Sequence, residues 1–295
     1  MELRHLRYFI AVAEELNFTR AAQRLNTAQP SLSQQIQDLE HEVGTPLFIR
    51  TKRSVSLTTA GQVFLDEARL TLAQSRRAIA SARRAAEIDG QKLTVGFVPA
   101  AEIKIFPHIL TFMRAHFPKL QLQLQSLTTM EQRAALLRGD IDIAFLRLPM
   151  EDAGLKAQTV LRERLVAVLP ANHALASRTQ VSLTELAETP FLEISPLQGG
   201  MLFNIIRDSM KSQDVTLQTA QQVENVLTLL TLIGLGFGFS LLPDYAESLA
   251  FRNVTTIPLS GPPIHIDLLM AWREDDQSPE NAAFRELVND RTKID

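Results

Sequence analysis

The chain has 295 residues, of which 45% are hydrophobic, and its 30 Lys and Arg side chains against 33 Asp and Glu give a formal net charge of −3. This length predicts two or three domains, each able to bury a core. Because the chain has no cysteine, disulfides, thiolate metal sites and cysteine nucleophiles are excluded. Its start reads as an amphipathic helix rather than a signal peptide, and no run of 18 apolar residues occurs. We therefore expect a cytoplasmic protein with no membrane partner.

The most informative segment is FTRAAQRLNTAQPSLSQQIQDLE at residues 18–40, which predicts two short amphipathic helices joined by a tight turn at Asn26. The first helix, with Thr19 as its expected N-cap, has small alanines on its buried side and so permits a close helix crossing. In the second helix the apolar positions lie within about 60° of one another. They are Leu32, Ile36, Leu39 and Val43. The pattern predicts a helix-turn-helix.

The opposite side of the second helix carries short or neutral groups instead of the Glu and Lys usual on a solvated helix. They are Pro30, Ser33, Gln34, Gln37 and His41. Gln can bond adenine in a bidentate way and Ser can bond any base, whereas a carboxylate there would meet phosphate repulsion. This face therefore suits the base edges of DNA. The alternative is an ordinary helical hairpin whose polar face happens to be uncharged.

Segments on either side extend the DNA-binding interpretation. Residues 3–16 predict a further helix that completes a three-helix core. Residues 47–57 predict a small hairpin, or wing, because an apolar run is followed by a basic turn and then by alternating apolar residues. The cations of that turn, Arg50, Lys52 and Arg53, are expected to face the sugar-phosphate backbone. The alternative for these three is a solvated run of charge.

The full pattern LRYFIAVAEELNFTRAAQRLNTAQPSLSQQIQDLEHEVGTPLFIRTKRSVSLTTAG, within residues 1–61, resembles the winged helix-turn-helix of the LysR-type transcriptional regulators. The resemblance implies a DNA-binding domain at 1–58, and the chain length and domain order also fit that family. The segments MELRHLRYF, LTVGFVPAAE and LLMAW are most similar to activators of aromatic-acid catabolic operons, such as phenylpropionate, cinnamate, benzoate and muconate regulators. The candidate DNA contacts are Thr19, Arg20, Gln29, Pro30, Ser31, Ser33, Gln34, Gln37, Arg50, Lys52 and Arg53.

Residues 59–88 predict a long helix with Thr58 as its cap. Small or apolar side chains recur every three or four residues along it: Phe64, Ala68, Leu72, Ser75, Ile79, Ala82 and Ala86. A second copy of the chain is the simplest partner for this stripe, and packing on the carboxy-terminal domain is the alternative. Residues 1–91 carry a net charge of only +2 and residues 92–295 carry −5, so a dimer that doubles the DNA contacts is expected. The LysR resemblance likewise implies paired linker helices, and residues 89–91 read as the hinge.

From Lys92 onward the pattern changes to alternating strands and helices and predicts an α/β domain. The first half has strands near 92–98, 120–127 and 141–148, a helix near 102–116 that is broken early by Pro107, and a helix near 130–138. The second half has strands near 165–170, 191–194, 217–223 and 238–243 and helices near 200–212 and from Asn225, followed by a strand at 265–272 and a helix at 279–291. By the LysR resemblance, residues 92–295 form a two-lobed effector-binding domain like periplasmic binding proteins of type 2. Lobe I would comprise about 92–161 and 267–295, and lobe II about 162–266.

In open α/β sheets, ligands bind beyond the carboxyl ends of the strands, where helix N-termini offer free N–H groups. The candidate effector contacts are Pro99, Ala100, Ala101, Glu102, Thr128, Thr129, Arg147, Gln198, Gly199, Gly200, Phe203, Asn225 and Phe239. Hydroxyls, N–H groups and Arg147 suit a small carboxylate, with Phe203 and Phe239 as aromatic walls. LysR relatives often carry Ser where Ala100 stands, so one expected carboxylate contact is missing. Helix capping is the alternative role for Thr129, and an interlobe salt bridge for Arg147.

Other classes of protein fit the sequence less well. The glycines of GLGFGFS at 234–240 do not form a dinucleotide-binding turn, the six histidines lack metal-ligand spacing, and no P-loop or GxSxG occurs. We therefore expect no catalytic residue, no metal and no cofactor. A solute-binding protein would explain two lobes but not residues 1–88.

The sequence therefore predicts an effector-responsive, DNA-binding activator of a catabolic operon that senses a small, aromatic carboxylate. Its expected partners are double-stranded promoter DNA, the organic acid, and further copies of the chain. By the mechanism that the LysR resemblance implies, a homotetramer made of two dimers bends promoter DNA, and the effector changes the bend in favour of RNA polymerase.

Overall fold

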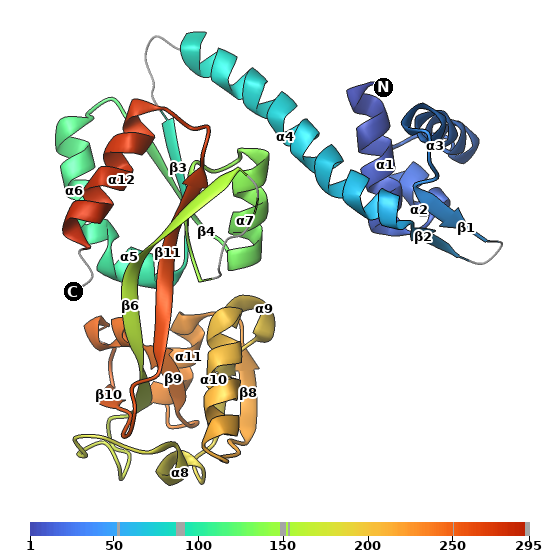
Figure 1. Ribbon diagram of the computed structural model, residues 1–295. Helices are drawn as coiled ribbons and strands as arrows, with labels where there is room; N and C mark the ends of the chain where they lie inside the picture. The colour runs from blue at the N-terminus through green and yellow to red at the C-terminus, as the bar shows by residue number, and fades with distance from the viewer. Residues whose placement is uncertain (52–53, 87–91, 148–151, 153, 250, 293–295) are drawn as a thin grey trace. The chain divides into compact units, whose positions relative to one another are not determined.

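The computed structural model describes residues 1–51, 54–86, 92–147, 152, 154–249 and 251–292 (Figure 1). The chain divides into two compact units, the first formed essentially by residues 1–88 and the second essentially by residues 89–295. Each unit has a hydrophobic core of its own. Within the described residues, no helix is both long enough and apolar enough to cross a membrane.

The first unit begins with three helices, α1 (Leu3–Glu15), α2 (Phe18–Arg24) and α3 (Gln29–Val43). Phe9 of α1 and the predicted Leu32 and Ile36 of α3 have no exposed surface, whereas Val43, predicted as the last residue of the same stripe, is 36% exposed at the end of α3. The prediction of Thr19 as the cap of α2 is wrong, because the Asn17 side chain accepts hydrogen bonds from the backbone N–H groups of Thr19 and Arg20. The tight turn after α2 does contain Asn26, in the left-handed conformation with φ 50°.

A two-stranded wing follows the three helices, formed by β1 (Phe48–Arg50) and β2 (Val55–Leu57). The wing leads into α4 (Thr59–Ala86), where the Thr58 hydroxyl accepts a hydrogen bond from the N–H of Gly61. The first turn of α4 lies so close to the wing that a Cβ on Gly61 would be 2.0 Å from the carbonyl oxygen of Leu47. Only glycine fits at this crossing without a shift of backbone.

The apolar stripe of α4 has a partner within the same unit along its first half. Leu65, Ala68 and Leu72 are buried in one core with α1. Neither a second copy of the chain nor the carboxy-terminal domain, the two partners expected for the stripe, is needed to bury these turns. Farther along the described part of α4, Ile79 is 53% exposed, so this position of the stripe lies outside the core of the first unit.

Lobe I of the second unit has the parallel strands β4 (Gln121–Ser126), β3 (Lys92–Phe97) and β5 (Ile143–Leu146), with β3 in the centre. Its helices are α5 (Pro99–Lys104), α6 (Phe106–His116), α7 (Thr129–Arg138) and α12 (Pro279–Arg291). The helix predicted near 102–116, with an early break at Pro107, is two helices that meet at Ile105. The first begins already at Pro99, a favoured residue in a first helical turn.

Lobe II contains the strands β7 (Phe191–Ile194), β8 (Thr219–Val223), β9 (Ser240–Pro243) and β10 (Val254–Pro258). Its helices are α8 (Leu183–Leu186), α9 (Pro196–Gly199), α10 (Met201–Ser212), α11 (Val226–Gly234) and the 3-10 helix η1 (Asp244–Ser248). Strand β10 and residues 155–164 were not predicted as strands. They were missed because polar residues interrupt their apolar alternation.

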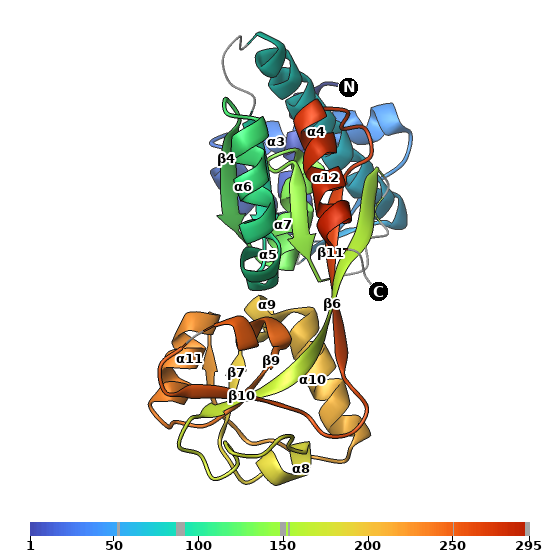
Figure 2. The ribbon, with the colours of Figure 1, turned by 90° about the vertical axis from the view of Figure 1, so that its left-hand side faces the viewer.

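Two long antiparallel strands, β6 (Leu155–Pro170) and β11 (His265–Arg273), connect the two lobes. Both run from one lobe into the other, as Figure 2 shows. In lobe I, β11 pairs with β5, whereas in lobe II, β6 pairs with β9 and β10. The same pair of strands therefore belongs to both sheets and fixes how the lobes join.

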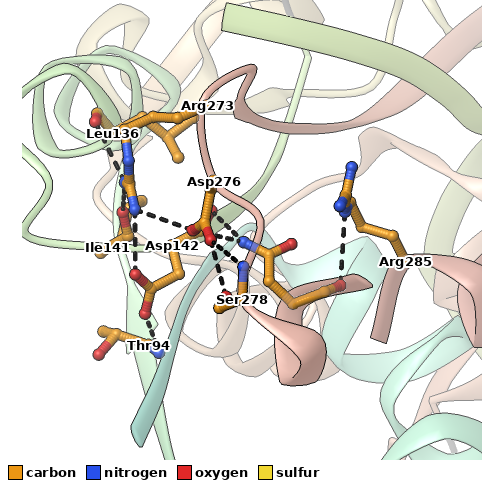
Figure 3. Close-up of polar contacts among 9 residues, drawn as sticks. Thr94, Leu136, Ile141, Asp142, Arg273, Asp276, Ser278 and Arg285 are labelled. Atoms are coloured by element: carbon orange, nitrogen blue, oxygen red, sulfur yellow. Dashed lines mark hydrogen bonds and ion pairs between the residues drawn. The ribbon is translucent and has the colours of Figure 1, made fainter. Parts of the chain in front are cut away.

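A buried polar network fixes the carboxy-terminal elements to lobe I (Figure 3). Arg273 at the end of β11 is only 3% exposed, and its guanidinium donates to the carbonyls of Leu136 and Ile141 and to the carboxylates of Asp142 and Asp276. Asp276 also accepts from the Asn281 amide of α12. Arg273 thus links the end of β11 to Asp142, which directly precedes β5, and through Asp276 to α12.

Candidate functional site

The polar face of α3 is accessible over most of its length. Pro30 at the start of the helix and Gln34 and Gln37 in its middle are all exposed, and the predicted contacts Gln29 and Ser31 are exposed as well. Ser33 is only half-buried. The side chains predicted to read bases therefore lie on one exposed helix face, with the buried stripe of Leu32, Ile36 and Leu39 behind them.

One acidic residue belongs to this face and was not predicted. The Nε2 atom of Gln34 donates a hydrogen bond to Oδ1 of Asp38 at 2.9 Å, and Asp38 is exposed. The spacing of four residues, which places two side chains next to each other on a helix, would have revealed this pair. The contacts predicted on this helix are all uncharged, because a carboxylate there meets repulsion from phosphate.

Arg50 does not lie in the wing turn as a free cation, which corrects the expectation for this residue. It is on strand β1, forms an ion pair with Glu40, and stacks over the Phe18 ring at 4.9 Å from the centroid. Glu40 also accepts from the backbone N–H groups of Leu47 and Phe48. This arrangement joins α3 to the wing. Lys52 and Arg53 lie outside the described residues.

A second ionic cluster links α4 to the helix-turn-helix. Glu14 on α1 binds Arg24 at the end of α2 (2.8 Å) and Arg69 on α4 (3.0 Å). Burial alone would raise the pKa of Glu14, but hydrogen bonds from Arg69 and Arg24 outweigh it and hold the pKa below the usual value. The predicted contacts Thr19 and Arg20 are exposed at the start of α2, where Arg20 donates to the backbone oxygen of Glu15.

In lobe I, the predicted effector contacts differ in their exposure and in their hydrogen bonds. Ala100 and Ala101 are fully buried, while Pro99 is half-buried and Glu102 is exposed. Thr128 forms a capping box with Glu131, whose pKa is lowered by the hydrogen bonds from Thr128. Thr129, for which capping was the alternative, instead accepts from the backbone N–H of Arg147 at 3.4 Å.

In lobe II, Gln198, Gly199 and Gly200 end α9 and precede α10. Asn225 caps α11 by accepting from the N–H of Thr228. Phe203 is half-buried with Arg207 over its ring. Phe239 is fully buried against Phe191. The prediction of Phe239 as an aromatic wall is therefore corrected, since its ring is part of the lobe II core.

Arg147, at the end of β5, is 7% exposed and forms an ion pair with Glu163, which is 1% exposed on β6. Lys104 of α5 lies 3.5 Å from the other oxygen of Glu163 and also pairs with Asp244 of η1. Burial raises the pKa of the neighbouring Tyr245, with the charge of Arg147 opposing and that of Glu163 adding to the shift. The salt bridge anticipated for Arg147 is thus formed, but with the strand that connects the lobes.

Arg147 also lines a cavity of about 440 Å³ beside the crossing of β6 and β11. The other lining residues are Thr159, Arg162, Met201, Ile205, His265, Ile266, Asp267 and Leu269. Among the described residues, Nη1 of Arg147 has no hydrogen-bond partner. Of the predicted effector contacts, only Arg147 lines this cavity. Most of the other predicted contacts follow strands or begin helices, whereas most lining residues come from α10 and from the strands β6 and β11.

Comparison with known proteins identifies the two units. Residues 3–62 match the model of the bacterial regulatory helix-turn-helix proteins of the lysR family, and residues 87–293 match the model of the LysR substrate binding domain. The chain belongs to the LysR family. As a LysR regulator it is a DNA-binding transcriptional regulator and not an enzyme, which confirms the family and the fold class predicted from the sequence.

Individual LysR relatives match over nearly the whole chain. The Hca operon transcriptional activator HcaR of Escherichia coli (strain K12) is 39% identical over 291 residues, covering 99% of this chain and 98% of that protein. The crystal structure of full-length BenM is similar with a TM-score of 0.61 and 30% identity, covering 98% of this chain and 96% of that one. Full-length CbnR complexed with its target DNA is similar with a TM-score of 0.60 and 27% identity, covering 99% of this chain and 100% of that one.

Proposed function

We propose that this LysR regulator activates a catabolic operon in response to a small aromatic carboxylate, bound in the cavity beside Arg147. The observation that carries the proposal is the spare Nη1 donor of a nearly buried arginine that lines a cavity of about 440 Å³. A carboxylate suits an arginine, because both groups are planar and their hydrogen bonds are charge-assisted. Met201, Ile205 and Leu269 supply apolar surface for a ring.

The role as an activator is supported by the relative that activates the Hca operon and by the resemblance to aromatic-acid regulators. The cavity volume lies within the range of about 300–1,000 Å³ that small-molecule sites occupy. An anion beside Arg147 would compete with Glu163 for its guanidinium, and Glu163 lies on a strand that belongs to both lobes. Effector binding would thereby alter contacts at the junction of the lobes.

Replacing Arg147 by methionine is expected to lower the binding affinity for aromatic carboxylates at least tenfold, since a hydrogen bond to a charged group is lost. The measurement is a thermal-shift titration of the full-length protein with benzoate, cinnamate and 3-phenylpropionate. At 100 times its dissociation constant a ligand stabilises by about 2.7 kcal/mol. The neutral amides of the same acids should produce little shift.

The single variant leaves Glu163 buried with only Lys104 as a partner, so it can lose stability for that reason alone. The double variant Arg147→Met, Glu163→Gln removes both charges and serves as the stable background. Arg164→Met is the control, because Arg164 is an exposed cation on β6 that pairs with Asp244 and Glu247 but does not line the cavity. Equal shifts for acids and amides, or full acid binding by the double variant, would overturn the carboxylate proposal.

On double-stranded promoter DNA, we infer that α3 lies in the major groove and that Gln34 reads a base. Replacing Gln34 by alanine is expected to cost roughly 1–3 kcal/mol in binding to the specific operator while leaving random duplex almost unaffected. Fluorescence anisotropy with both duplexes measures the difference. Gln62→Ala, at an exposed position of α4, is the control. An equal loss on both duplexes would contradict base reading.

We further propose that the regulator assembles as a homotetramer of two dimers. In this assignment residues 1–58 bind DNA, 59–88 pair two copies, 89–91 act as the hinge and 92–295 sense the effector. Support comes from the exposed Ile79 on α4 and from Leu227, Leu235 and Phe237 in lobe II, which are 66%, 69% and 56% exposed. Such large exposed apolar side chains mark interaction surfaces when they cluster.

RNA polymerase is the proposed downstream partner, and the cytoplasm the place of action.

A further inference from the structure

Asp38 and Gln34 stand one helical turn apart on the exposed face of α3, and their side chains are joined by the 2.9 Å hydrogen bond from Nε2 to Oδ1. Both side chains are exposed, so the core does not hold the Gln34 amide in place. Asp38 is the partner that the structure provides for this amide. The pair lies on the same helix face as Pro30 and Gln37.

The chemistry of the pair determines which way the amide faces. An ionised carboxylate can only accept hydrogen bonds, whereas an amide has a donor side and an acceptor side. The nitrogen of Gln34 must therefore face Asp38, and its oxygen Oε1 is left as the outward acceptor. Without Asp38 the amide could rotate and present either side.

We propose that Asp38 is a positioning residue that presents Gln34 to DNA as a hydrogen-bond acceptor. This inference rests on the proposed role of α3 in reading bases. In the major groove, adenine N6 and cytosine N4 are the donors, whereas guanine O6 and thymine O4 are acceptors. The free Oδ2 of Asp38 is an acceptor too, and carboxylates accept from cytosine N4. At one base pair, the two side chains therefore accept a hydrogen bond from the base that carries an amino group. On the contacted strand, A or C is thus preferred over G or T.

This role also explains why a carboxylate occupies a surface that faces phosphate. Its negative charge weakens binding to every sequence, so the charge is a cost unless it improves discrimination. The Asp38–Gln34 pair thus lowers the total affinity for DNA but raises the ratio of specific to non-specific binding. This ratio determines which sites are occupied among the many competing sites of a genome.

The test is a binding selection with the full-length protein and a pool of duplexes containing a randomised segment, followed by sequencing of the bound duplexes. The wild type should show one base pair per half-site with A or C favoured on one strand, and Gln34→Ala should erase that preference. Asp38→Ala should reduce it roughly five- to tenfold, the value of one oriented hydrogen bond. Asp38→Glu should retain it, because a carboxylate is kept at the same spacing.

Asp38→Asn separates orientation from charge. An Asn–Gln amide pair is satisfied in either orientation, so this variant should lose the base preference although it keeps a hydrogen bond. If Asp38 acted only by repelling phosphate, Asp38→Asn and Asp38→Ala would tighten binding to all duplexes equally and leave the preference unchanged. Glu42→Gln removes a charge one turn farther along α3, where Glu42 pairs with the amino group of Met1, and should change binding to all duplexes equally without changing the base preference.

Two results would contradict different claims. A preference unchanged by Gln34→Ala would overturn the reading of a base by Gln34, and with it the proposed function of this face. A preference lost in Gln34→Ala but kept in both Asp38→Ala and Asp38→Asn would overturn the role of Asp38 alone. Melting temperatures of all variants, followed by circular dichroism, report whether the helix remains folded.

Discussion

Replacing Arg273 by leucine is expected to lower the free energy of unfolding of the second unit by about 3–5 kcal/mol, the usual cost of removing one partner from a buried charged network. The guanidinium is 3% exposed and serves two carboxylates and two backbone carbonyls (Figure 3). Leucine would leave Asp142 and Asp276 buried without their cation. Strand β5 and helix α12 would then lose the group that joins them.

The measurement is chemical denaturation followed by tryptophan fluorescence. The chain has one tryptophan, Trp272, which precedes Arg273 on β11, so the signal reports on the second unit alone. Lys156→Ala is the matched control, because Lys156 pairs with Glu274 at 2.8 Å but both side chains are 56% exposed. Exposed pairs contribute about 0–1 kcal/mol. A loss for Arg273→Leu no larger than for Lys156→Ala would contradict the network's role.

Asp276 adds a dependence on pH to the same network. Burial alone would raise the pKa of Asp276, but hydrogen bonds from Ser278, the charge of Arg273 and the Asn281 amide outweigh it, and the pKa lies below the usual 3.8. A carboxyl with a lowered pKa in the folded state stabilises the protein above its unfolded-state pKa, and this contribution is lost as the pH falls through the folded-state value. The stability difference between wild type and Asp276→Asn should therefore shrink below about pH 4.

Replacing Gly61 by alanine is expected to destabilise the first unit by about 2–3 kcal/mol, as overpacking does in a tight contact. In a helix, alanine is more favourable than glycine by about 1 kcal/mol. Helix propensity alone would therefore predict that this substitution stabilises the first unit. The new Cβ would lie 2.0 Å from the Leu47 carbonyl oxygen, which accepts the backbone N–H of Thr58. Relief of the clash must move β1, and with it the Phe48 ring that contacts Phe9.

Hydrogen exchange of the full-length protein would locate the effect, with faster exchange expected in α1, β1 and the first turns of α4. DNA affinity should fall as the wing shifts, while the transition seen by Trp272 fluorescence should stay unchanged because it reports on the second unit. Val63→Ala is the control, since Val63 is 62% exposed on α4 and its replacement raises helix propensity without a clash. If the backbone amides of Gly61→Ala were as protected from hydrogen exchange as those of this control, the contact between α4 and Leu47 would tolerate a side chain at position 61.

The helix-turn-helix was readable from sequence because its signals are local. The stripe of Leu32, Ile36 and Leu39 is set by helical periodicity, and all three residues are fully buried. The Asn26 turn is likewise a short-range property of the chain. The cap of α2 was misassigned by two residues, since Asn17 and Thr19 are both good caps by residue type.

The site was harder to predict because its contacts cross long stretches of chain. Arg50 looked like a free cation in a basic turn, and its pairing with Glu40 depends on how the wing packs against α3. Phe239 looked like a cavity wall, yet it packs on Phe191 in a core. The cavity is lined mainly by residues of β6, β11 and α10, which come together only in the folded lobes.

The sequence by itself determined the LysR family, the winged helix-turn-helix and the α/β character of the second unit, because periodicity, turn residues and motif spacing act over a few neighbouring residues. Only the tertiary structure decided which charged side chains form ion pairs, and that Nη1 of Arg147 remains a hydrogen-bond donor without a partner among the described residues. Arg147 and Glu163 are 16 residues apart, and Arg273 and Asp142 are 131 apart. Desolvation and pairing of such groups depend on what the fold places around them, and no local pattern in the chain encodes those neighbours.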